Sequence, residues 1–124
     1  MISGKVTYRQ RDLLLTRFPF SDLEHAKVRP VLVVSNDLYN RRAADLIVCA
    51  ITSSPRPHVY SVEITDLDLE TGHLRVASKV RVDAITAIEQ SIILKRIGRM
   101  GVAKYAATIA LLLRLISLPR KATT

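Results

Sequence analysis

The sequence has few of the residues that build covalent or metal-held frameworks. It contains one cysteine, Cys49, and three histidines, so a disulfide within the chain and a cysteine-based zinc site are both excluded. Cys49 lies inside an apolar run, where a small buried side chain is expected. A lone cysteine suits a reducing compartment. We therefore expect a cytoplasmic protein that uses no metal and no cofactor.

Glycine, aromatic residues and long apolar runs are also scarce. With only four glycines, the chain has no glycine-rich loop of the kind that cradles phosphates. Tryptophan is absent and aromatic residues make up 5%, so platforms for base stacking are few. The apolar run at 109–113 stops at Arg114, far short of the roughly 20 residues that span a membrane. Residues 1–12 are polar and charged, so we expect neither a signal peptide nor a membrane segment.

The residues that are present indicate one basic domain with a real core. The chain has 124 residues, enough for one domain (1–124, with a core at about 12–118), and 48% of them are hydrophobic. Its net charge of +8 favours an anionic partner such as RNA, DNA or an acidic protein. A soluble basic protein without such a partner is the alternative.

Hydrophobic periodicity predicts mainly β structure. Residues 28–35 are apolar at both odd and even positions, which is typical of a strand covered on both faces. Pro30 fits such a strand only at its start or on an edge. We expect a turn or short helix at 36–42, loops at 20–27 and 53–57, and a turn-rich acidic connection at 65–72. Further strands are expected at 13–18, 46–52, 58–64, 78–88 and 92–100.

Near the C-terminus the period changes to that of a helix. Between Gly101 and Pro119, apolar residues recur at i, i+3 and i+4, which predicts one amphipathic helix with its stripe packed on the strands. The stripe consists of Val102, Tyr105, Ala106, Ile109, Leu112, Leu113 and Ile116. Several short strands followed by one helix indicate a small, strongly curved sheet or barrel.

Three motifs in 18–53 carry a family resemblance. They are Phe18-Pro19-Phe20-Ser-Asp-Leu, Val28-Arg29-Pro30 and Ile51-Thr52-Ser53, and Gly72-His73-Leu74 and Ile97-Gly98-Arg99-Met100 follow. In this order they resemble the MazF/PemK/Kid toxins of type II toxin–antitoxin systems, over about residues 12–118. The resemblance implies an SH3-like barrel with a C-terminal helix that forms a homodimer. It also implies a metal-independent endoribonuclease that cuts single-stranded RNA at short sequences and is neutralised by the acidic tail of a cognate antitoxin.

Arg29 and Thr52 are the first catalytic candidates that the resemblance implies. The planar guanidinium of Arg29 can hold two phosphate oxygens and stabilise the charge that develops when the 2′-hydroxyl attacks phosphorus. The hydroxyl of Thr52 can donate to the phosphate and orient the 2′-oxygen. Each has a plain structural alternative, as a surface arginine at a strand start and as an ordinary strand threonine.

Arg81 and Asp83 form a second candidate pair. One branch of the family has an Arg-x-Asp pair in its active site, and Arg81-Val82-Asp83 matches it. Both side chains point to the same face of a strand. Asp83 could then accept the 2′-hydroxyl proton while Arg81 holds the phosphate, although an ion pair on a solvated face fits the sequence equally well.

The residues expected to bind RNA lie mainly in loops, since single-stranded bases are read by stacking and edge contacts. They are Phe20, His25, Lys27, Ser53 and Arg56. None of the three histidines, His25, His58 and His73, matches a functional position of the family, and His25 is the best of them for acid–base chemistry.

Two departures from the family keep other functions open. Arg11-Asp12 stands where the family often has Gly-Asp, so the entry turn is expected to differ, and the acidic segment 65–70 is unusual beside an RNA groove. The alternatives are a non-catalytic toxin of the same fold that binds DNA gyrase, and a degraded toxin that serves as an antitoxin-binding module. The retained Arg29 and Thr52 favour the ribonuclease.

Overall fold

A computed structural model describes residues 6–18 and 27–120. Seven strands and two α-helices make up these residues, with two short 3-10 turns. The strands are β1 (Asp12–Phe18), β2 (Lys27–Val33), β3 (Asp45–Thr52), β4 (Ser61–Ile64), β5 (Leu69–Gly72), β6 (Ser78–Glu89) and β7 (Ile93–Met100). The helices are α1 (Asp37–Arg42) and α2 (Val102–Ile116), and the 3-10 turns are η2 (Asp66–Asp68) and η3 (Gln90–Ile92).

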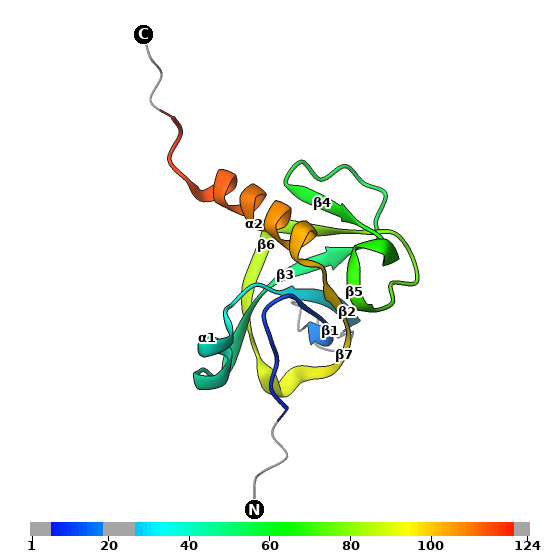
Figure 1. Cartoon of the computed structure of the whole chain (residues 1–124), viewed down its shortest axis with the longest axis vertical. Helices are drawn as coiled ribbons and strands as arrows, with labels where there is room; N and C mark the ends of the chain where they lie inside the picture. The colour runs from blue at the N-terminus through cyan, green and yellow to red at the C-terminus, as the bar shows by residue number, and fades with distance from the viewer. Residues whose placement is uncertain (1–5, 19–26, 121–124) are drawn as a thin grey trace, which may run out of the picture.

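The strands form one curled antiparallel sheet. Its order is β4-β6-β3-β2-β1-β7-β5, and α2 packs against β4 and β6 (Figure 1). The register of β6 against β3 shifts between Cys49 and Ala50, so β6 bends there and can follow the curl. The expected architecture, a small curved β structure with a C-terminal helix, is confirmed.

The central strands are buried on both faces. Leu13 and Leu32 belong to one core with Ile51 and Met100, whereas Leu14 and Val31 belong to a second core on the other face. This confirms the double coverage predicted for residues 28–35 from Val31 onward, whereas Val28 and Arg29 are exposed. Pro30 is paired with Leu15 of β1, and pairing of β2 with β3 begins only at Val31. Proline therefore lies where β2 is still open on one side, as predicted.

The segment between β4 and β6 corrects one prediction. The acidic connection expected at 65–72 contains η2 and then β5, which pairs with β7. Gly72 explains why the strand forms there, because its φ is +85° and a Cβ atom would lie 2.2 Å from the carbonyl oxygen of Ile97. Only glycine lets the two backbones approach this closely. The strand predicted at 58–64 is also shorter, since β4 begins at Ser61.

Arg11 has a left-handed backbone conformation, with φ of 79°. An arginine in this region costs roughly 1–2 kcal/mol that a glycine would not. Hydrogen bonds on both sides hold it: its N–H donates to the Val33 carbonyl over 3.0 Å, and its guanidinium donates to the Met100 carbonyl over 2.7 Å. The guanidinium also pairs with Glu70 at 3.3 Å. The chain thus accommodates arginine at the turn where the family often has glycine.

Helix α2 follows the predicted bounds but is only partly covered. Gly101 precedes it as the N-cap, and Leu112 is buried. The Tyr105 hydroxyl donates to the Val34 carbonyl over 3.1 Å, which ties the helix to the end of β2. Val102, Ala106, Leu113 and Ile116 are exposed, so the packing predicted for the whole apolar stripe is wrong for these four residues. The C-terminal half of the helix extends beyond the sheet (Figure 1).

We expect Gly72→Ala to lower the free energy of unfolding by about 3 kcal/mol, because it adds backbone strain and a contact with a carbonyl that cannot move away. Gly101→Ala is the matched control. Its added Cβ would meet only the Asp68 carbonyl at 3.1 Å, so we expect a loss below about 1 kcal/mol. Urea unfolding of both variants measures this difference. Equal stabilities would contradict the close approach of β5 to β7.

Candidate functional site

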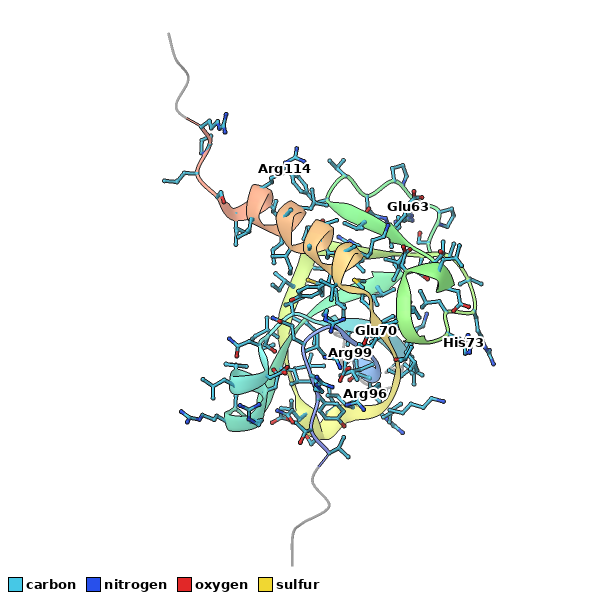
Figure 2. The ribbon with its side chains drawn as sticks, viewed as in Figure 1. Glu63, Glu70, His73, Arg96, Arg99 and Arg114 are labelled. Atoms are coloured by element: carbon cyan, nitrogen blue, oxygen red, sulfur yellow. The ribbon has the colours of Figure 1, made fainter. Side chains whose placement is uncertain are left out.

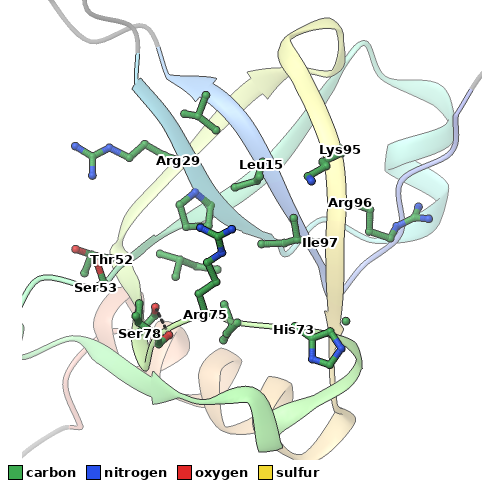
Figure 3. A pocket seen from close by; sticks show the side chains of 16 residues that line it. Leu15, Arg29, Thr52, Ser53, His73, Arg75, Ser78, Lys95, Arg96 and Ile97 are labelled. Atoms are coloured by element: carbon green, nitrogen blue, oxygen red, sulfur yellow. Dashed lines mark hydrogen bonds between the residues drawn. The ribbon is translucent and has the colours of Figure 1, made fainter.

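An open groove of about 820 Å³ lies beside the ends of β2 and β3. Arg29, Thr52 and Ser53 line one side of it, and Lys95, Arg96 and Ile97 of β7 line the opposite side (Figure 3). The segment that joins β5 to β6 closes the groove and contributes Arg75. The groove is therefore built from three parts of the chain that the sheet curl brings together.

The sheet register sets Arg29 opposite Thr52. Val31 pairs with Ala50 in the antiparallel ladder between β2 and β3. Continuing this register by two residues places Arg29 across from Thr52, and paired residues project from the same face. The two candidates that the sequence separates by 22 positions thus lie on neighbouring strands at one rim of the groove. The structure brings them together as predicted, while their catalytic roles stay predictions.

The hydroxyl of Thr52 is held in place by the chain that follows it. Its Oγ1 accepts a hydrogen bond from the Ser54 N–H over 3.1 Å. A hydroxyl can accept there and still donate its own proton. Among the described residues no acceptor is present for that proton. Thr52 therefore offers a donor to a ligand in the groove.

The groove is cationic. None of its lining residues is Asp or Glu, whereas Arg29, Arg75 and Lys95 all line it. Arg96 lines it too, but its Nε donates to the buried carboxylate of Asp12 over 2.9 Å, so part of its charge is already balanced. An anion that enters the groove would meet cations on both sides and no carboxylate from the lining residues.

The rim opposite Thr52 is anchored by Asp66. One of its oxygens lies 3.3 Å from Nδ1 of His73, and the other accepts the Leu74 N–H over 2.9 Å. The Leu74 N–H first and His73 second lower the pKa of Asp66, so it is a carboxylate at neutral pH. The acidic segment 65–70 thus reaches the edge of the groove and holds His73, which lines it.

Arg81 and Asp83 form an ion pair on exposed surface. Nε and Nη2 of Arg81 each lie 3.1 Å from an oxygen of Asp83, which is a two-point contact. Arg81 pairs with Ala50 in the ladder, two residues before Thr52, so it projects from the same face of the sheet as Thr52. Neither Arg81 nor Asp83 lines the groove. Arg81 therefore lies across from Ala50, two residues before Thr52, and both Arg81 and Asp83 lie outside the cavity.

The residues predicted to bind RNA are distributed unevenly. Ser53 lines the groove, whereas Lys27 and Arg56 are exposed and do not line it. Arg56 is part of the 53–57 loop, where its carbonyl accepts a hydrogen bond from Lys79 over 2.5 Å. Phe20 and His25 lie outside the described residues, as does most of the loop predicted at 20–27.

Sequence reasoning missed the cations on the far side of the groove. Arg75 and Lys95 match no motif. The place of Arg75 depends on the pairing of β5 with β7, which was not foreseen, whereas Lys95 is placed by the pairing of β7 with β1. One signal was available: a glycine, Gly72, shortly before a long strand is typical of a turn.

Three further observations concern metal ligands, the single cysteine and membrane-spanning helices. Within residues 6–18 and 27–120, no three His, Cys, Asp or Glu side chains are grouped as metal ligands. Burial raises the pKa of the Cys49 thiol to about 12, so it is not a thiolate nucleophile at neutral pH. In the described part of the chain, no helix has the length and apolar character needed to cross a membrane.

The fold is a curled antiparallel sheet with a C-terminal helix and a cationic groove. A comparison with known protein families identifies the class of protein to which such a fold belongs. The model of the PemK-like, MazF-like toxin of type II toxin–antitoxin systems matches residues 9–116. The chain belongs to this family. No curated protein sequence matches it significantly.

Solved structures show the same fold at low sequence identity. An endoribonuclease in complex with its cognate antitoxin, from a Mycobacterial species, is 20% identical, with a TM-score of 0.72 over 92% of this chain and 99% of that one. MazF in a MazE–MazF complex from Deinococcus radiodurans is 18% identical, with a TM-score of 0.75 over 92% and 100%. The toxin MazF-mt6 from Mycobacterium tuberculosis is 20% identical, with a TM-score of 0.71 over 88% and 99%.

The Arg81–Asp83 pair predicts a measurable pH dependence. The hydrogen bond from Arg81 holds the pKa of Asp83 below its ordinary value, against a smaller opposing effect of burial. The stability that this pair contributes is therefore present above the unfolded pKa of about 3.9 and is lost as pH falls through the lower folded pKa.

We expect the Asp83 carboxyl carbon, followed by NMR, to titrate below pH 3.9 in the wild type and near 3.9 in Arg81→Ala. Arg114→Ala, which removes an exposed arginine from α2, is the matched control and leaves the Asp83 pKa unchanged. A wild-type pKa at or above 3.9 would show that the pair does not form in solution.

Proposed function

We propose that this protein is the toxin of a type II toxin–antitoxin system and acts in the cytoplasm, as one domain, by cutting RNA. It cleaves single-stranded RNA at a short sequence, through attack of the 2′-hydroxyl on the adjacent phosphorus and without a metal. The observation that carries the proposal is that Arg29 and Thr52, on neighbouring strands, both line one groove whose lining residues include cations and no carboxylate.

The reaction needs charge stabilisation at phosphorus more than any other contribution. As the 2′-oxygen bonds to phosphorus, the non-bridging oxygens gain negative charge. The Arg29 guanidinium can donate two N–H groups to them at once. Thr52 adds a hydroxyl donor whose oxygen is already fixed by the Ser54 N–H. The bond from phosphorus to the 5′-oxygen breaks, the 5′-oxygen takes a proton from solvent water, and the products carry a 2′,3′-cyclic phosphate and a 5′-hydroxyl.

The proton of the 2′-hydroxyl needs an acceptor, and Asp83 is the candidate. It is ionised at neutral pH because Arg81 lowers its pKa. Arg81 is also the cation that a carboxylate near RNA requires. Thr52 and Arg81 project from the same face of the sheet, one ladder step apart. In this role Arg81 balances the charge of Asp83 while Asp83 takes the proton.

The same proposal includes a cognate antitoxin and a homodimer. A net charge of +8 and a cationic groove suit the acidic tail of an antitoxin, which would compete with RNA for the groove. Val102, Leu113, Ile116 and Leu118 on and after α2 are more than half exposed, and a protein partner would remove them from water.

The first test is incubation of the purified protein with a long single-stranded RNA in EDTA, followed by mapping of the ends. Cuts at one short motif with 2′,3′-cyclic phosphate and 5′-hydroxyl ends would support the proposal. Uncut RNA together with trapping of DNA gyrase on DNA would replace it with a gyrase-binding toxin. Uncut RNA with retained antitoxin binding would indicate an inactive binding module.

We expect Arg29→Ala to slow cleavage by at least about 10³-fold and Thr52→Val by about 10²–10³-fold, since each removes a donor to the developing charge. Thr52→Ser keeps the hydroxyl and retains most of the activity. Single-turnover rates on the mapped RNA motif measure these effects, with Arg114→Ala as the control at wild-type rate. Thr52→Val cutting as fast as Thr52→Ser would remove Thr52 from the catalytic site.

A further inference from the structure

The residues proposed to act on the cleaved phosphate line only one side of the groove. Arg29, Thr52 and Ser53 occupy one side, and Arg75 projects into the space between them and β7 (Figure 3). Drug-sized ligands fill cavities of roughly 300–1,000 Å³. A groove of about 820 Å³ therefore has room for more than the one phosphodiester that is cut.

Arg75 is free to bind an anion. It is exposed, and among the described residues no carboxylate lies within 4.0 Å of it. Arg96 is the contrasting case on the other side of the groove, because Asp12 and the Thr7 carbonyl already accept its donors. Arg75 thus presents a guanidinium without a partner, at a place where the lining residues supply no carboxylate.

The backbone around Arg75 is held on both sides. Before it, Gly72 packs against Ile97, and Asp66 accepts the Leu74 N–H over 2.9 Å. After it, the Ser78 hydroxyl donates to the Val76 carbonyl over 3.1 Å. A ligand that binds Arg75 therefore orders one side chain and not a whole loop, which keeps the entropic cost of binding low.

We infer that Arg75 binds a phosphate of the RNA next to the phosphate that is cut, so that the groove holds its substrate at two phosphates. This rests on the proposed ribonuclease function. The apolar side chains of Leu15, Pro30 and Ile97 also line the groove, and they suit the faces of bases. Arg75 acts through binding and positioning: it holds the strand so that the neighbouring phosphate lies against Arg29 and Thr52.

The experiment uses an RNA oligonucleotide with the mapped motif and a 2′-deoxyribose at the cut nucleotide, which removes the nucleophile. Its dissociation constant is measured from 50 to 200 mM salt for the wild type, Arg75→Ala, Arg75→Lys and Arg114→Ala. Arg114 is exposed on α2, away from the groove, so its variant removes the same charge elsewhere (Figure 2). Cleavage of the all-ribose oligonucleotide gives KM and kcat for the same proteins.

We expect Arg75→Ala to weaken binding about fivefold and to reduce the slope of log affinity against log salt by about 0.7, the value for one phosphate contact on a single strand. KM rises while kcat at saturating RNA and the position of the cut stay unchanged. Arg75→Lys restores the salt slope because the charge is kept, and Arg114→Ala matches the wild type.

Three results would overturn the inference. If the wild type cleaves RNA and Arg75→Ala has the same salt slope and KM, Arg75 is not part of the RNA site, and the proposed function stands. A loss confined to binding of a hexaglutamate peptide, with RNA binding intact, would make Arg75 a contact for an acidic protein. A wild type that neither binds nor cuts any RNA would overturn the proposed function and this inference together.

Discussion

Strand β2 pairs with β1 on one side and with β3 on the other, and side chains on both of its faces are buried. This double burial holds the register. A slip of one residue would exchange Leu32 with its neighbours Val31 and Val33 between two separate cores, and it would turn Arg29 away from Thr52. The position of the groove residues is therefore a consequence of core packing at Val31, Leu32 and Val33, since residues 27–29 of the same strand are exposed.

The charged residues fall into two groups: those that hold the fold together and those that line the groove. Asp12 is buried and takes its cation from Arg96, and Glu70 pairs with the strained Arg11. Asp12 and Glu70 thus hold parts of the chain together through these pairs. The groove is lined by Arg29, Arg75, Lys95 and Arg96 and by no carboxylate, so it forms a cationic region of the surface.

Much of the fold could be predicted from the sequence, because local periodicity decided it. Helix α2 has the predicted bounds, since Gly101 and Pro119 flank an unbroken apolar repeat. Strand β5 was missed because it has four residues, of which only Leu69 is partly buried, so no alternation shows in the sequence. The exposed Ile116 was predicted to be covered, because periodicity shows which residues share a helix face and not how far the sheet extends beneath it.

Only the site residues that belong to a family motif could be predicted from the sequence. Arg29 and Thr52 were found through the family resemblance, and the register then places them together. The place of Arg75 depends on long-range pairing between β5 and β7, for which Gly72 was the one local signal, and that of Lys95 depends on pairing between β7 and β1. Whether Asp83 faces the cavity depends likewise on the bend of β6, and that bend arises from a register shift against β3.

The single buried cysteine has a practical consequence for the study of this groove. With its pKa near 12 and no exposure, Cys49 will not react with maleimide or nitroxide reagents in the folded protein. A cysteine introduced at any exposed position would be the only reactive thiol among the described residues. A spin label or fluorophore could therefore be attached beside the groove without first rebuilding the core, and the motion of bound nucleic acid could be followed from one defined point.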